Sequence, residues 1–107
     1  GDYAEAVKNY RMVLKEYPEF AEAHYNLAVT LEKTGDWAGA LVHYRRVISL
    51  DPRKAEAHYN RGLILAGKND FYRAARSFRC ALELAPDLEE AARALEKVEK
   101  VLEDQSE

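Results

Sequence analysis

The chain has 107 residues, 33% of them charged and 48% hydrophobic, which is typical of one modest helix-rich domain or of a few small repeated units. No apolar run reaches the 18 residues of a membrane-spanning helix. The net charge of −3 divides into +2 for residues 1–86 (13 bases, 11 acids) and −5 for residues 87–107 (3 bases, 8 acids), and neither part indicates a nucleic-acid partner.

The first predicted helix covers roughly residues 3–16. Residues 1–3, GDY, overlap the start of this helix, and similar letters recur as GDW at 35–37 and as NDF at 69–71. The sequence therefore starts in the middle of a repeated unit. We therefore expect a fragment of a longer array, whose first helix lacks the helix that normally precedes it. The apolar surface left uncovered at this end predicts self-association.

Residues 21–54 predict two helices. Apolar side chains recur at helical spacing from Glu22 to Leu31, Gly35 can end that helix with a positive φ, and Asp36 can cap the next one. The second helix places six residues on one face: Trp37, Ala40, Leu41, Tyr44, Val47 and Ile48.

Residues 55–88 repeat the pattern of residues 21–54. The letters AEAHYN stand at residues 21–26 and again at 55–60, and Asn69 replaces Gly35 at the turn, where asparagine is the next most tolerant residue. A shift of 34 residues also aligns prolines, alanines and aromatic residues in three copies: Pro18, Pro52 and Pro86; Ala6, Ala40 and Ala74; Tyr10, Tyr44 and Phe78.

Residues 89–107 predict a terminal helix. Its apolar residues form one stripe with 3-4-3-4 spacing: Leu88, Ala91, Leu95, Val98 and Leu102. A single stripe suits a helix that covers the last repeat and turns a polar face to water. A coiled-coil dimer is the alternative, which so short a stripe disfavours. We expect residues 103–107 to be frayed.

These positions together resemble the tetratricopeptide repeat (TPR), a 34-residue motif with the pattern W-x2-L-G-x2-Y, A-x3-F, P. The first complete copy contains His24, Leu27, Ala28, Leu31, Ala40, Tyr44 and Pro52 at these positions, and the second His58, Arg61, Gly62, Leu65, Ala74, Phe78 and Pro86. The resemblance implies an all-α, right-handed superhelical solenoid of antiparallel helix pairs. Its parts are the second half of a truncated TPR (1–20), two complete TPRs (21–54 and 55–88), and a capping helix with a frayed tail (89–107).

The resemblance also implies how the helices pack. Small residues at Ala28 and Gly62 let the two helices of a repeat approach closely. Four large rings are expected to fill the remaining space: Trp37, Tyr44, Phe71 and Phe78. Arg61 departs from the pattern, which has a buried leucine there. Because a buried guanidinium needs a partner, we expect its head to reach an acid in the next segment: Glu89, Glu90 or Glu96.

No residue pattern indicates catalysis, a metal or a cofactor. His24 and His58 occupy equivalent positions one repeat apart, too far from each other to share a zinc ion. His43 has no acid or cysteine at helical-neighbour spacing, and the sequence has no glycine-rich phosphate loop. Cys80, the single cysteine, is predicted to be packed or half-exposed and is compatible with a reducing compartment, which favours the cytoplasm.

In the TPR family, the first helix of each repeat lines a concave groove that holds an extended peptide or a partner helix. Carried over by position, the groove consists of Glu22, Tyr25, Asn26, Val29, Glu32 and Lys33, then Glu56, Tyr59, Asn60, Leu63, Ala66 and Gly67, with Arg93 and Lys97 closing its far end. An asparagine amide both donates and accepts, so Asn26 and Asn60 suit a peptide backbone. Alternatively, the tyrosines and asparagines serve helix packing.

We therefore predict a non-catalytic scaffold that binds a protein or peptide ligand, without nucleic acid or membrane insertion. The alternative is a structural spacer, or the regulatory arm of a larger enzyme such as a glycosyltransferase. Family members that clamp the terminal carboxylate of chaperones use Lys, Asn, Asn, Lys and Arg. The corresponding residues here are Tyr25, Val29, Asn60, Glu90 and Ala94, so one position of five fits.

A column of arginines is expected on the opposite, convex side: Arg11, Arg45 and Arg79, with Arg46, Arg73 and Arg76 nearby. Such a column could dock an acidic partner, but we expect a solvated charged face.

Overall fold

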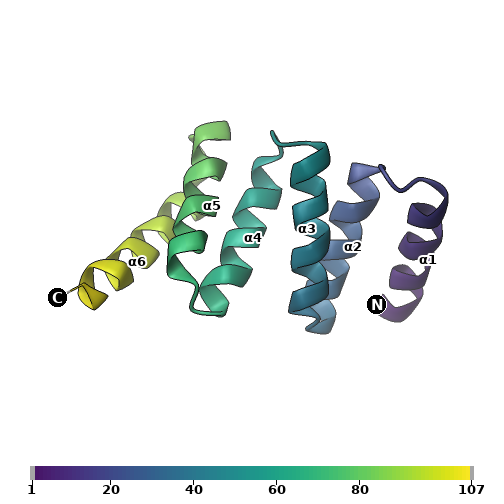
Figure 1. Ribbon diagram of the computed structural model, residues 1–107, viewed down its shortest axis with the longest axis horizontal. Coiled ribbons are helices and arrows are strands. Elements are labelled where there is room, and N and C mark those ends of the chain that lie inside the picture. The colour runs from purple at the N-terminus through teal and green to yellow at the C-terminus, as the bar shows by residue number, and fades with distance from the viewer. Residues whose placement is uncertain (1, 107) are drawn as a thin grey trace. The chain divides into compact units, whose positions relative to one another are not determined.

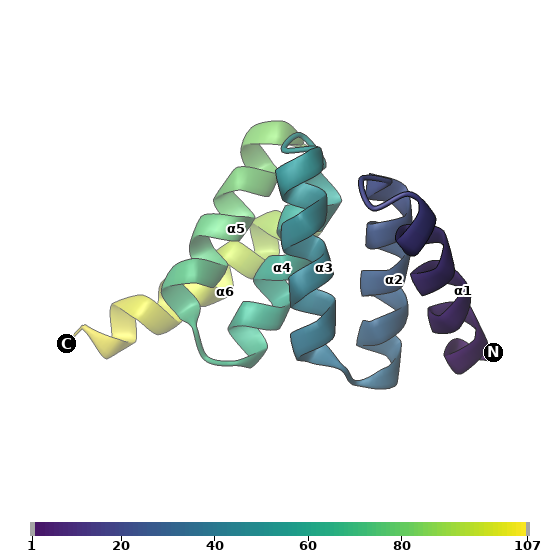
Figure 2. The same ribbon diagram turned by 45° about the vertical axis from the view of Figure 1, so that its right-hand side comes forward.

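The computed structural model describes residues 2–106, which form six helices and no strand (Figures 1 and 2). Predictions for Gly1 and Glu107 fall outside the described residues. The chain divides into two compact units, one ending at Pro52 and the other beginning at Arg53. The first contains α1 (Tyr3–Glu16), α2 (Ala21–Thr34) and α3 (Trp37–Leu50), and the second α4 (Ala55–Gly67), α5 (Phe71–Leu84) and α6 (Glu89–Gln105).

The helix boundaries repeat as the sequence predicted. Asp36 caps α3 by accepting from the Gly39 amide, and Asp2 and Asp70 cap α1 and α5 in the same way. The preceding turns use left-handed backbone, with φ of 84° at Gly35 and 63° at Asn69. The predicted glycine and asparagine turns are thus confirmed.

In the first unit, α2 packs between α1 and α3 (Figure 1). The core lies between α2 and α3, where Leu27, Ala28, Tyr44 and Val47 are fully buried. The Tyr44 hydroxyl donates a hydrogen bond of 2.6 Å to Glu32 Oε2, so this buried ring keeps a polar partner. By contrast, α1 has no buried residue.

One packing prediction in this unit is wrong. Trp37 was expected to fill space between helices, but 51% of its surface is exposed. It is the first residue of α3, whereas the buried residues of that helix begin at Ala40. The ring therefore lies outside the buried stretch of α3.

In the second unit, α5 packs against both α4 and α6, and α6 also contacts α4 (Figure 2). Phe78 is fully buried, and its ring lies so close to α4 that a Cβ atom added at Gly62 would stand 2.5 Å from Phe78 Cε1. The close helix approach predicted from Gly62 is therefore present. Phe71, by contrast, is only half-buried.

Arg61 has a polar partner on α5 that the sequence did not predict. Its Nε donates to the hydroxyl of Ser77 on α5 over 3.0 Å, and Ser77 is 1% exposed. The sequence prediction named only acidic partners for Arg61, and Ser77 is uncharged. The hydroxyl satisfies one donor of a guanidinium that is half-buried against α5.

Helix α6 is longer than predicted. Residues 103–105 were expected to fray, but they are helical, and the Ser106 hydroxyl donates to the Glu103 carbonyl over 2.8 Å. Ala91 and Val98 of the predicted apolar stripe are buried, and Leu88, Leu95 and Leu102 are half-buried. None of the helices within residues 2–106 has the length and apolar character needed to cross a membrane.

Candidate functional site

The predicted groove residues of the first unit lie on α2. Glu22 and Lys33 are exposed, whereas Tyr25, Asn26 and Val29 are half-buried. The Tyr25 ring meets the buried Tyr44 ring edge-on, with centroids 5.8 Å apart. Tyr25 therefore contributes to helix packing as well as to the surface.

The second unit presents the same arrangement on α4. Glu56 is exposed, Tyr59 and Asn60 are half-buried, and 42% of Leu63 is exposed. The Tyr59 ring packs against Phe78 with centroids 5.9 Å apart. An exposed leucine in line with half-buried tyrosine and asparagine gives α4 a mixed apolar and polar surface.

A hollow of about 340 Å³ lies beside this surface, between α4 and α6. The α4 wall consists of Tyr59, Leu63 and Ala66, and the α6 wall of Glu90, Arg93, Ala94 and Lys97, above buried Phe78 and Val98. The hollow brings together five predicted groove residues: Tyr59, Leu63, Ala66, Arg93 and Lys97. Among the described residues, Glu56 and Asn60 are not part of its lining.

Charge is unevenly placed along the α6 wall of this hollow. Glu90 lies in the first turn of the helix, and Arg93 and Lys97 follow toward its middle. Arg93 forms an ion pair of 3.7 Å with Glu89, but the two side chains are 65% and 81% exposed, so water screens this pair. The wall is thus acidic near the start of α6 and basic farther along.

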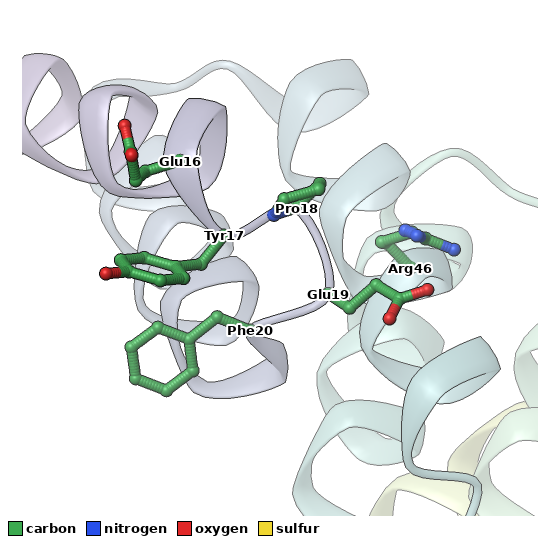
Figure 3. A pocket seen from close by; sticks show the side chains of 6 residues that line it. All are labelled: Glu16, Tyr17, Pro18, Glu19, Phe20 and Arg46. Atoms are coloured by element: carbon green, nitrogen blue, oxygen red, sulfur yellow. The ribbon is translucent and has the colours of Figure 1, made fainter.

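A second hollow, of about 670 Å³, lies at the turn between α1 and α2 (Figure 3). It is lined by Glu16, Tyr17, Pro18, Glu19 and Phe20 with Arg46 of α3. The Tyr17 and Phe20 rings lie next to each other on one side of the turn, and Glu19 extends on the side of Arg46 (Figure 3). No sequence pattern predicted this hollow; Tyr17 and Phe20 in its lining are 64% and 47% exposed.

Two histidines that the sequence analysis treated separately form a pair in the first unit. The His24 and His43 rings stack with centroids 5.3 Å apart, and their Nδ1 atoms are 3.0 Å apart. His24 Nε2 lies 2.8 Å from the Pro18 carbonyl oxygen. Because a carbonyl only accepts, His24 carries its proton on Nε2, and His43 Nδ1 donates to His24 Nδ1. The pair joins α2, α3 and the turn before α2.

Stability of the first unit is expected to fall in mild acid. Burial, His24 and Arg11 of α1 lower the pKa of His43 from its ordinary 6.5, and Asp36 only partly opposes this. Below pH 6.5 the unfolded chain therefore takes up the proton more readily than the folded one. The first unit therefore has its full stability above pH 6.5. It loses part of that stability as the pH falls from 6.5 toward the lower pKa that His43 has in the folded protein. Urea unfolding between pH 7.5 and pH 5 measures this loss.

The matched control is His43→Ser, since serine occupies the equivalent position, Ser77, in the second unit. This variant should lose less stability than the parent between pH 7.5 and pH 5. Equal losses in the two proteins would contradict a role for His43.

The arginines of the predicted convex column are exposed. Arg79 pairs with Glu99 at 3.0 Å, and Arg73 pairs with its capping residue Asp70 at 3.6 Å. Part of this positive charge is thus balanced within the second unit.

Cys80 is half-buried, as predicted. Within residues 2–106, no three His, Cys, Asp or Glu side chains gather as metal ligands would.

Antiparallel helices with aspartate caps and left-handed turns recur every 34 residues, which defines a helical repeat protein (Figure 1). The chain belongs to the tetratricopeptide repeat family. Models described as TPR repeat match residues 1–35 and 31–69, and one described as tetratricopeptide repeat matches residues 55–88. The resemblance inferred from the sequence is thereby confirmed. No curated protein matched the chain.

Solved structures show the same fold. A MamA structure matches with a TM-score of 0.92 and 24% identity, covering 99% of this chain and 62% of its own. The first TPR of Spaghetti (RPAP3), bound to an HSP90 peptide, matches with a TM-score of 0.90 and 24% identity, covering 95% of this chain and 81% of its own. A mutant O-GlcNAc transferase from Thermobaculum terrenum matches with a TM-score of 0.81 and 32% identity, covering 92% of this chain and 19% of its own.

These matches establish the all-α TPR solenoid as the fold class. The chain spans less than two thirds of the MamA and O-GlcNAc transferase chains. We therefore treat the binding partner, and the surface that binds it, as proposals.

Proposed function

We propose that this chain is a non-catalytic interaction module that binds a peptide or a partner helix on the first-helix surface of its repeats. The observation that carries the proposal is the recurrence of one surface in both units. Each presents a half-buried tyrosine and asparagine beside an apolar residue: Tyr25, Asn26 and Val29 on α2, and Tyr59, Asn60 and Leu63 on α4.

The asparagines are the residues proposed to bind the ligand backbone. An amide side chain offers a donor and an acceptor, so it can bond a peptide whatever side chains the peptide carries. The tyrosine rings add apolar area, but they also pack on Tyr44 and Phe78, so replacing them would disturb the fold. Asn26 and Asn60 are therefore the better probes of binding.

A random dodecapeptide library displayed on phage tests the proposal. We expect the parent to retain peptides that Asn26→Ala/Asn60→Ala loses, because a lost backbone bond costs about 1 kcal/mol, or about fivefold in affinity, at each position. Circular dichroism establishes that each variant is folded, and Asn26→Asp/Asn60→Asp provides an isosteric second variant that replaces each amide donor by a charged acceptor.

Two results would overturn the proposal. One is retention of no peptide by the folded parent. The other is retention of the same peptides by the parent and both asparagine variants. A double variant of the α1–α2 turn, Tyr17→Ser/Phe20→Ser, serves as the matched control, since both rings are exposed and lie outside α2 and α4. It should bind as the parent does.

A regulatory arm of a larger enzyme is the second candidate. The match to the O-GlcNAc transferase, at 32% identity over 92% of this chain, favours it. Peptide recognition by the same surfaces would then deliver a protein to a catalytic domain elsewhere in the polypeptide. Sequencing the complete gene product distinguishes the two: a catalytic domain on the same polypeptide supports the arm, and its absence supports a separate scaffold.

A further inference from the structure

We infer that the hollow between α4 and α6 selects an apolar side chain that has an acidic side chain beside it in the ligand sequence. This inference rests on the proposed function, since it names the peptide class that the second unit takes. It concerns one site within that unit, the hollow of about 340 Å³.

The bottom of the hollow is apolar. Phe78 is fully buried beneath it, Val98 is 5% exposed, and Leu63 offers an exposed apolar wall. A volume of about 340 Å³ is at the small end of ligand sites, so it suits one or two side chains rather than a cofactor. Covering Leu63 with an apolar side chain removes surface from water that the fold leaves exposed.

The rim supplies the charge preference. Arg93 and Lys97 are one helical turn apart on α6, and both line the hollow, against one acid, Glu90. The two cations lie farther along α6 than Glu90. A carboxylate beside the anchor is therefore attracted at the Lys97 end and repelled at the Glu90 end, so the acid should flank the anchor on one side only.

The carboxylate is that of a side chain, not of a peptide C-terminus. Glu90 and Ala94, which line the hollow, stand where carboxylate-clamp relatives of the family have lysine and arginine. A terminal carboxylate would thus meet a single acid and a methyl group where those relatives supply two cations. The exposed walls of Leu63, Arg93 and Lys97 instead suit a chain that continues in both directions.

The phage-displayed library tests this inference directly, because fusion blocks the C-terminus of every displayed peptide. Sequences retained by the parent should carry Leu, Ile, Val, Met or Phe with Asp or Glu within two residues, predominantly on one side. Lys97→Glu should lower the affinity for a synthetic, C-terminally amidated form of such a peptide about tenfold. The same variant should favour the peptide in which lysine replaces the acid.

Lys100→Glu is the matched control, since Lys100 is exposed on α6 but does not line the hollow. It changes the net charge equally and should leave both affinities within about twofold. Leu63→Ser should weaken all retained peptides without changing the preference for acid. Lys97 and Leu63 are both exposed, so folding is preserved in these variants.

Failure of this inference differs from failure of the proposed function. Retained peptides without a paired apolar and acidic residue, or equal effects of Lys97→Glu and Lys100→Glu, would overturn the inference and leave peptide binding intact. Retention of no peptide would overturn both.

Discussion

Phe78→Ala is expected to destabilise the second unit by about 3–5 kcal/mol, the range for truncating a buried phenylalanine. Its ring is fully buried, packs with Tyr59 and lies directly against Gly62 of α4. Small domains have a total stability of about 5–15 kcal/mol, so this loss is a large fraction of the total. Urea unfolding followed by circular dichroism measures it.

The control for this substitution lies on the same helix. Tyr72 is 74% exposed, so Tyr72→Ala removes a ring of similar size that is not part of the core. It should change the free energy of unfolding by less than about 0.5 kcal/mol. Similar losses from the two substitutions would contradict the packing described for α4 and α5.

Gly62→Ala is expected to destabilise the same unit by about 1–3 kcal/mol. The added Cβ would lie 2.5 Å from Phe78 Cε1, and the buried ring has little room to withdraw. Alanine normally stabilises a helix relative to glycine by about 0.5–1 kcal/mol, so the sign of the result tells which effect dominates.

Gly67→Ala provides the matched comparison. Gly67 is the last residue of α4, and nothing lies within 4 Å of a Cβ atom placed there. This variant should be neutral or slightly more stable than the parent. Stabilisation by both substitutions would show that the contact between Gly62 and Phe78 is looser than described.

The fold could be predicted almost completely from the sequence, because a 34-residue period fixes several structural features at once. The turn at Gly35, its equivalent at Asn69 and the buried rings Tyr44 and Phe78 all follow from positions that recur. Trp37 was placed wrongly because a helix period predicts the face on which a residue lies but not how deeply a residue at the end of the helix is buried. The end of α6 was placed wrongly because a charged sequence with an apolar stripe can stay helical to its last turn.

The candidate site could be predicted only in part. Family position identified five of the lining residues, but not that they enclose one hollow with Glu90 and Phe78: Tyr59, Leu63, Ala66, Arg93 and Lys97. The contacts from His24 to His43 and from Arg61 to Ser77 join residues 19 and 16 positions apart on different helices. No spacing rule within one helix reveals such contacts, and each depends on residues that differ between the two repeats.

An NMR titration of the chain with a library-selected peptide tests the central claim most directly, because amide shifts report where the peptide lies. If the first-helix surfaces bind, the largest shifts will fall on α2 and α4 around Asn26 and Asn60, and on α6 around Lys97. Shifts confined to the α1–α2 turn at Tyr17 and Phe20, or to the arginines of α3 and α5, would contradict the account.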